Sequence, residues 1–393
     1  MCALCASLAT VEAFFVNSRH PATMVGRTSL SSTKPRVQDA SSVLQDMRAE
    51  MAKDENANLV MQALRGANIN DDDTAMAGLQ MRLVDIAPQE NDALLTVYNP
   101  TALKAFFSKR PRAVLTRIFQ VTSVGGGFFF NIVLDKLLGR LERNPDLEVE
   151  RAAELRDLIT SLGPFYIKIG QALSIRPDIL SPRSMVELQK LCDKVPSYDS
   201  KIAFATIEKE LGKPVDELFS KITPEPVAAA SLGQVYKATL RETGDIVAVK
   251  VQRPAVLETV SLDLYLAREV GMLLRNFPAL SSRLDAVALL DEFAFRFYQE
   301  LDYVLECENG TRIKKDMAVL PMVVIPENYP NYTSRRVHVA EWIDGEKLSS
   351  SKADDVGALV NLGVITYLTQ LLDRGFFHAD PHPGNMMRTT ASL

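Results

Sequence analysis

Hydrophobic residues recur every three to four positions in several long stretches of the chain, a pattern typical of helices with one buried face. The clearest case follows Pro145, where seven apolar residues between Val149 and Leu162 keep helical spacing until Gly163 and Pro164 end the pattern. Two helices are also expected between Thr101 and Arg143, separated or kinked at a run of three glycines. Further helices are predicted over 165–174, 201–211, 257–274, 286–308 and 354–375.

Shorter segments with a different pattern lie between these helices. Residues 226–240 and 246–252 are rich in small and β-branched side chains, and turn-forming residues from Glu242 to Asp245 separate them. The two segments therefore predict an antiparallel strand hairpin. Strands are also expected at 323–325 and 336–340, which makes the fold class α+β.

Composition narrows the class of protein. The chain has 393 residues, of which 47% are hydrophobic and 24% charged, and these values are ordinary for a soluble globular protein. A net charge of -5 gives no electrostatic reason to expect a nucleic-acid partner. Cys2 and Cys5 have the spacing of metal ligands, but no second pair completes a zinc site. Four scattered cysteines fit a reducing compartment better than a disulfide framework.

The first 38 residues have the composition of an organelle transit peptide. They contain one acidic residue, Glu12, together with four basic residues and many serines and threonines. An organelle address is predicted; the composition does not choose between the chloroplast and the mitochondrion, and a disordered tail without an address is the alternative. Residues 39–92 are acid-rich and predict a partly disordered linker.

One long uncharged run, 118–134, is slightly short for a membrane span and carries Gln120, Asn131 and three glycines. We expect an apolar helix packed on the domain. The alternative is peripheral attachment to a membrane or lipid droplet.

The first strand of the predicted hairpin carries a candidate phosphate loop. The sequence from Ala228 to Val235 has the layout of the kinase glycine-rich loop G-x-G-x-x-G-x-V, with alanine at the first two glycine positions. Small residues let the backbone approach phosphates closely, although they can equally serve tight packing in a turn. The candidate nucleotide-binding residues of this segment are Ala228, Ala229, Ala230, Ser231, Gly233 and Val235.

Two further motifs complete a kinase-like set. On the second strand, 247–250 matches the V-A-I-K strand, whose lysine, here Lys250, holds the α- and β-phosphates, whereas a lone strand lysine would point into solvent. Near the C-terminus, 378–385 matches H-x-D-x-x-x-x-N, in which Asp380 would orient the acceptor hydroxyl and Asn385 would bind Mg²⁺. A metal site built from His378 and His382 is disfavoured because intervening prolines prevent the helix that would align them.

These motifs, in this order, resemble the UbiB (aarF-domain) atypical kinases, most closely the plant and algal plastid branch. The family's K-x-G-Q motif is matched by Lys168, Gly170 and Gln171. Its E-x-D motif is matched by Glu300 and Asp302, and the resemblance extends over about 98–388. It implies a protein-kinase-like fold with a β-rich N-lobe, the start of a helical C-lobe, and a helical N-terminal extension. The implied divisions are 1–38, transit peptide; 39–92, linker; 93–196, helical extension; 197–340, N-lobe; 341–393, hinge and incomplete C-lobe.

The resemblance also implies roles for individual residues. Lys250 would contact ATP phosphates and pair with Glu306; helical spacing puts Asp302 and Glu306 on one face and does not choose between them. Lys168 would meet Glu300 and Asp302 over the site, with Gln171 emerging on the same helix face as Lys168. Glu341, Trp342 and Ile343 would sit where a hinge holds the adenine ring, and Ala248 is a further candidate nucleotide-binding residue.

The implied function is an ATP- and Mg²⁺-dependent kinase or ATPase of plastid prenylquinone metabolism, acting on a lipid or protein acceptor at a plastoglobule or thylakoid membrane. Kinase folds carry a second metal-binding aspartate, in D-F-G, about a dozen residues after the asparagine. The sequence ends at Leu393, before that point, so we expect weak nucleotide binding and little turnover from this polypeptide. The alternatives are a non-catalytic lipid-associated regulator and a small-molecule phosphotransferase of the aminoglycoside or choline kinase type.

Overall fold

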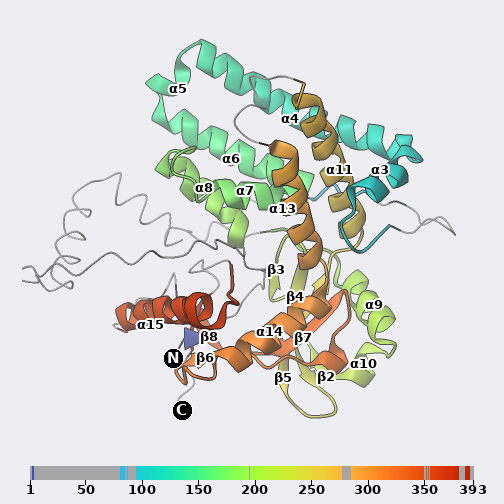
Figure 1. Ribbon diagram of the computed structural model, residues 1–393, viewed down its shortest axis with the longest axis vertical. Helices are drawn as coiled ribbons and strands as arrows, with labels where there is room; N and C mark the ends of the chain where they lie inside the picture. The colour runs from blue at the N-terminus through green and yellow to red at the C-terminus, as the bar shows by residue number, and fades with distance from the viewer. Residues whose placement is uncertain are drawn as a thin grey trace, which may run out of the picture.

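A layer of helices lies beside an antiparallel sheet in the computed structural model of the chain (Figure 1). The structure describes residues 2–3, 80–84, 86, 94–193, 195–276, 285–348, 351, 353, 355–379 and 386–389. Nearly all of the predicted transit peptide and most of the predicted linker lie outside these residues.

In the described part of the chain, six helices precede the sheet. Prolines occupy the first position of most of them, where their missing N–H and fixed φ cost nothing. Asn144 caps α6 by accepting a hydrogen bond from the amide of Asp146, and Gly163, with φ of 108°, ends α6 where the sequence predicted. The helices are α3 (Pro100–Ser108), α4 (Pro111–Leu137), α5 (Arg140–Arg143), α6 (Pro145–Leu162), α7 (Pro164–Leu173) and α8 (Pro182–Asp193).

Two expectations about α4 are wrong. The helix runs without a break through the three glycines, and the interruption falls earlier, at 109–110, where Pro111 begins a new helix. Glycine lowers helix propensity without removing a hydrogen-bond donor, so it does not have to end a helix. The helix is also mainly exposed instead of packed on the domain: Phe119, Phe129 and Leu137 are 71%, 70% and 79% accessible. By length and apolarity alone, α4 and the segment Val356–Arg374 could each cross a membrane.

The sheet has the strand order β2-β4-β5-β7, with β3 paired to β4, and every pairing is antiparallel. The predicted hairpin is confirmed. Alternation along β5 sends its three valines into a core shared with α9, while Ala248 and Lys250 point to the other face. The elements of this lobe are α9 (Ser200–Leu211), α10 (Val215–Leu218), β2 (Phe219–Ile222), β3 (Ala228–Ala229), β4 (Gly233–Leu240), β5 (Ile246–Gln252) and β7 (Val337–Glu341).

The single helix predicted over 286–308 is in fact two helices. They are α13 (Ala286–Glu300) and α14 (Tyr303–Met317), which follow α11 (Val256–Leu274). Asp302 has an extended backbone, and its carboxylate accepts from the amide of Val304 at 3.1 Å, so it is the N-cap of α14. Asp302 therefore precedes the helix that carries Glu306. The prediction from spacing, that the two residues lie on one face of a single helix, is wrong.

The remaining elements include a helix and a small second sheet that lie close to each other in Figure 1. Helix α15 continues the chain into one π-helical stretch that Gly375 ends with φ of 62°, close to the predicted boundary. A small second sheet has the order β6-β1-β9-β8. These elements are β1 (Cys2–Ala3), β6 (Val323–Val324), η1 (Pro330–Tyr332), β8 (Gly345–Lys347), α15 (Val356–Leu368), η2 (Thr369–Arg374) and β9 (Met387–Thr389).

Candidate nucleotide site

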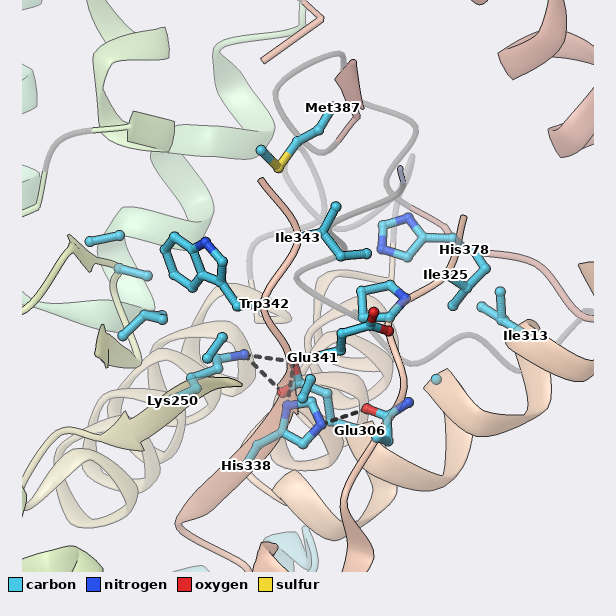
Figure 2. Close-up of a pocket in the computed structure, with 18 of the residues that line it drawn as sticks. Lys250, Glu306, Ile313, Ile325, His338, Glu341, Trp342, Ile343, His378 and Met387 are labelled. Atoms are coloured by element: carbon cyan, nitrogen blue, oxygen red, sulfur yellow. Dashed lines mark hydrogen bonds and ion pairs between the residues drawn. The ribbon is translucent and has the colours of Figure 1, made fainter. Parts of the chain in front are cut away.

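A cavity of about 380 Å³ lies between the sheet and α14, within the size range of small-molecule sites. Its walls come from β3, β4, β5, β7 and α14 and from residues that follow β7 (Figure 2). Most of the lining is apolar. The polar side chains that line it are Lys250, Glu306, Asn328, His338, Glu341, Trp342, Gln370 and His378.

Lys250 and Glu306 form an ion pair in this cavity. The ammonium of Lys250 lies 2.8 Å from each carboxylate oxygen of Glu306, and the two side chains are 20% and 6% exposed. The same nitrogen lies 4.6 Å from the centroid of the buried Tyr303 ring. The pairing follows from the fold, because β5 directs Lys250 away from the valine core and α14 presents Glu306 across the cavity. It is the contact that the family resemblance implied.

His338 is a cavity residue that sequence reasoning missed. It lies directly opposite Lys250 on β7, and its Nδ1 is 3.8 Å from a carboxylate oxygen of Glu306. Its Nε2 is 2.8 Å from the side-chain oxygen of Asn328. Burial lowers the pKa of His338, and the charge of Lys250 acts in the same direction against the opposing effect of Glu306. The β7 strand was predicted, but its register against β5 depends on tertiary contacts.

The alanine-rich loop contributes only part of its predicted set. Ala228, Ala230 and Val235 line the cavity, whereas Ala229, Ser231 and Gly233 do not. A Cβ on Gly233 would lie 2.5 Å from the carbonyl oxygen of Val251, so glycine is required there by strand packing.

Arg253 anchors the backbone of this loop by hydrogen bonds. Its Nε donates to the carbonyl of Ala230 at 3.0 Å, and its guanidinium also bonds the carbonyl of Pro196. Burial lowers the pKa of Arg253 to about 10, which leaves the guanidinium charged at neutral pH.

The segment after β7 closes one end of the cavity. Glu341, Trp342 and Ile343, the residues predicted for a hinge, all line it, together with Ala340 of β7 and Ala248 of β5. The Trp342 indole donates to Asp344 at 2.7 Å.

The K-x-G-Q residues reach two different neighbours. Lys168 pairs with Glu300 at 2.7 Å, which joins α7 to α13. The implied partner Asp302 instead caps α14, and no ion pair between Lys168 and Asp302 is formed in the described part of the chain. Gln171 donates to the carbonyl of Leu191 at 3.1 Å and so ties α7 to α8. Neither Lys168 nor Gln171 lines the cavity.

Asp380 and Asn385 lie outside the described residues. The structure does place the start of their motif: His378 lines the cavity, and its amide donates to the side-chain oxygen of Gln370 at 2.8 Å. Among the residues that the structure describes, no group of three or more His, Cys, Asp or Glu side chains is arranged to hold a metal ion.

Comparison with known proteins identifies the architecture around this cavity. The ABC1 atypical kinase-like domain matches residues 190–392, just over half of the chain. The chain belongs to the ABC1 atypical kinase-like family. The resemblance to aarF-domain kinases and the kinase-like α+β fold are thereby confirmed.

Several relatives are similar over most of this chain. An Arabidopsis thaliana protein named activity of BC1 complex kinase 3, chloroplastic, is 42% identical over 330 residues, which are 83% of this chain and 45% of that protein. An uncharacterized aarF domain-containing protein kinase from the same plant, also named chloroplastic, is 42% identical over 78% of this chain and 43% of its own. The chain thus spans less than half the length of these two relatives. A solved complex of Rv3197 with erythromycin from Mycobacterium tuberculosis is 28% identical, with a TM-score of 0.42 over 65% of this chain and 64% of that one.

Proposed function

We propose that this protein binds ATP with Mg²⁺ as an atypical kinase or ATPase of plastid prenylquinone metabolism. The observation that carries the proposal is the Lys250–Glu306 ion pair in the wall of a largely apolar cavity. An apolar cleft suits the purine ring, and a lysine held at one point by a buried carboxylate suits the phosphates. Family membership supports phosphoryl transfer or ATP hydrolysis as the reaction class.

The residues of the cavity would act mainly by positioning charge. Lys250 would neutralise the charge of phosphate oxygens, and its ion pair with Glu306 would keep the Lys250 ammonium from turning toward solvent. Bound Mg²⁺ would supply charge neutralisation at the β- and γ-phosphates, with Asn385 as a ligand and Asp380 orienting the acceptor hydroxyl. The carboxamide of Asn385 and the carboxylate of Asp380 fit those tasks by their chemistry. His378, the first residue of their motif, lines the cavity.

A plastid location is supported by the chloroplastic names of the plant relatives and by the transit-like composition of residues 1–38. The role in prenylquinone metabolism rests on the family resemblance. The acceptor is a lipid or a protein.

Calorimetric titration with Mg²⁺–ADP and Mg²⁺–ATP tests the nucleotide site. Lys250→Ala should weaken binding at least tenfold, about 1.4 kcal/mol, because the phosphates lose their lysine. Lys221→Ala is the matched control, since Lys221 is an exposed lysine of β2 in the same sheet. Equal affinity of the wild type and Lys250→Ala would exclude the proposed phosphate contact.

We also propose that the protein associates peripherally with a plastid membrane through α4. Phe119, Phe129, Phe130 and Leu137 are each at least 66% exposed on this helix, an apolar surface of the kind that inserts into a lipid interface. Sedimentation with galactolipid vesicles tests the proposal. The variant Phe129→Ser/Phe130→Ser should bind several-fold less, whereas Ile202→Ser, an exposed apolar residue of α9, should bind like the wild type. No vesicle binding by the wild type would contradict it.

A further inference from the structure

One carboxylate oxygen of Glu306 lies between two nitrogens. Its Oε1 is 2.8 Å from the ammonium of Lys250 and 3.8 Å from Nδ1 of His338. Figure 2 shows the imidazole beside the Lys250–Glu306 pair. A hydrogen bond from a protonated imidazole to a carboxylate is about 1 Å shorter than the distance to Nδ1. Of these two nitrogens, Lys250 therefore bonds Oε1 and His338 faces it without a hydrogen bond.

The second ring nitrogen decides where His338 carries its proton. Nε2 lies 2.8 Å from the side-chain oxygen of Asn328, so the proton on Nε2 donates to that oxygen. Burial lowers the pKa of His338, and the ring is neutral at pH 7. In this tautomer Nδ1 holds a lone pair and offers no proton to Glu306. The free protein thus keeps an empty proton site opposite an oxygen that would accept a hydrogen bond.

Charged groups reach His338 from two elements. Lys250 lies directly opposite on β5 and lowers the pKa of His338, whereas Glu306 of α14 raises it. The ring centroid of Tyr303 is 6.5 Å from that of His338, and burial raises the pKa of Tyr303 well above its usual value, so this phenol stays neutral. The other titratable residues in the cavity wall are Glu341 and His378. The protonation of His338 therefore depends on how closely Lys250 and Glu306 hold each other.

We propose that nucleotide binding draws a proton onto Nδ1 of His338, and that the protonated ring bonds the oxygen of Glu306 that Lys250 releases as it turns to the phosphates. The inference rests on the proposed nucleotide site. A phosphate beside Lys250 brings negative charge into the cavity and competes with Oε1 for the ammonium. Both changes favour the protonated ring.

The proton comes from solvent, and the new N–H donates to Oε1 of Glu306. The buried carboxylate then keeps a partner on each side while the ammonium of Lys250 contacts phosphate, which avoids the cost of an unsatisfied buried acceptor. His338 is thus a positioning residue, which acts on the phosphates through Glu306 and Lys250.

Calorimetric titration with Mg²⁺–ADP in PIPES, HEPES and Tris counts the protons taken up, because these buffers differ in ionisation enthalpy. Between about pH 6 and pH 8, the uptake by the wild type should reach a maximum of at least about half a proton per nucleotide. The dissociation constant should rise about threefold per pH unit there, since the number of protons taken up is the slope of its logarithm against pH. The same nucleotide is used throughout, so any proton exchanged by ADP itself is common to all variants.

Three variants assign the proton. His338→Gln does not titrate, so it should lose the uptake and flatten the dependence of the dissociation constant on pH. Asn328→Asp keeps the imidazole and places a carboxylate at Nε2, which should move the pH of maximum uptake upward by about one unit. Val339→Ala disturbs the same strand on its other face, in the valine core, and should keep the uptake of the wild type.

The outcomes separate this inference from the one on which it rests. Binding of Mg²⁺–ADP by the wild type without proton uptake overturns the inference alone. The same holds if His338→Gln retains the uptake, if Asn328→Asp leaves its pH dependence unmoved, or if Val339→Ala loses it as fully as His338→Gln. No binding of Mg²⁺–ADP by the wild type overturns both the nucleotide site and the role of His338.

Discussion

Two glycines in helix interiors should respond differently to the same substitution. Gly126, in the middle of α4, is surrounded by open space, and an added Cβ there would meet nothing within 4 Å. At Gly170, in the K-x-G-Q helix, an added Cβ would lie 2.6 Å from Leu191 Cδ1 and 3.1 Å from Ile159 Cδ1. Leu191 is fully buried and Ile159 nearly so, which leaves neither side chain room to turn away.

The expected magnitudes follow from these contacts. Alanine gains about 1 kcal/mol over glycine in a helix interior, and this gain applies at both sites. At Gly170 the overpacking costs about 1–3 kcal/mol. Gly126→Ala should therefore stabilise the protein, and Gly170→Ala should be less stable than Gly126→Ala by about 1–3 kcal/mol, because the shared propensity gain cancels in the comparison.

Urea unfolding followed by circular dichroism measures both variants against the wild type. The expected result is a higher midpoint for Gly126→Ala and a midpoint for Gly170→Ala below that of Gly126→Ala. If the two variants have the same free energy of unfolding, α7 is not packed against α8 as closely as the contacts of Gly170 require. The glycine of K-x-G-Q would then need another explanation.

Three further predictions concern charged and titratable groups. Arg117→Met leaves the fully buried Asp263 carboxylate without its 2.7 Å partner, so the free energy of unfolding in urea should fall by about 3–5 kcal/mol. The double variant Arg117→Met/Asp263→Leu should recover part of this loss. Equal stability of the single and double variants would count against the buried pair. Because the pKa of His338 is lowered in the folded protein, the unfolded chain takes up a proton at higher pH than the folded chain does. The stability present above about pH 6.5 should therefore be lost as the pH falls below it, with a slope of up to about 1.4 kcal/mol per pH unit. His338→Gln should show a shallower loss of unfolding free energy than the wild type over the same pH range. A double-mutant cycle of Lys168→Met and Glu300→Gln should give a coupling of about 1 kcal/mol, and strictly additive effects would argue against the bond between α7 and α13.

Local signals in the sequence were enough to locate many elements. Gly163, Pro164 and Gly212 mark helix ends because their backbone preferences act within a few residues. The hairpin around Gly244 was predictable for the same reason. The Lys250–Glu306 contact was predicted only through the family resemblance, because helical spacing did not choose between Asp302 and Glu306.

Other features depended on information that is spread over the tertiary structure. Periodicity continues through 286–308, so the break at Asp302 was hidden: a cap is a competition between side chain and backbone that apolar spacing does not report. The helical face shared by Lys168 and Gln171 was apparent, but their different partners, Glu300 and Leu191, come from packing of α7 between other helices. The exposure of α4 was likewise beyond pattern analysis, because a helix that is apolar all round gives the same signal whether protein or lipid covers it.

The most direct test of the central claim is chemical labelling with an acyl phosphate of ATP, which transfers its acyl group to a lysine amine beside the bound phosphates. Peptide mapping after labelling should find the new amide on Lys250, and an excess of Mg²⁺–ATP should suppress it. Labelling confined to other lysines, or labelling of Lys250 that ATP does not reduce, would contradict a nucleotide site built around the Lys250–Glu306 pair.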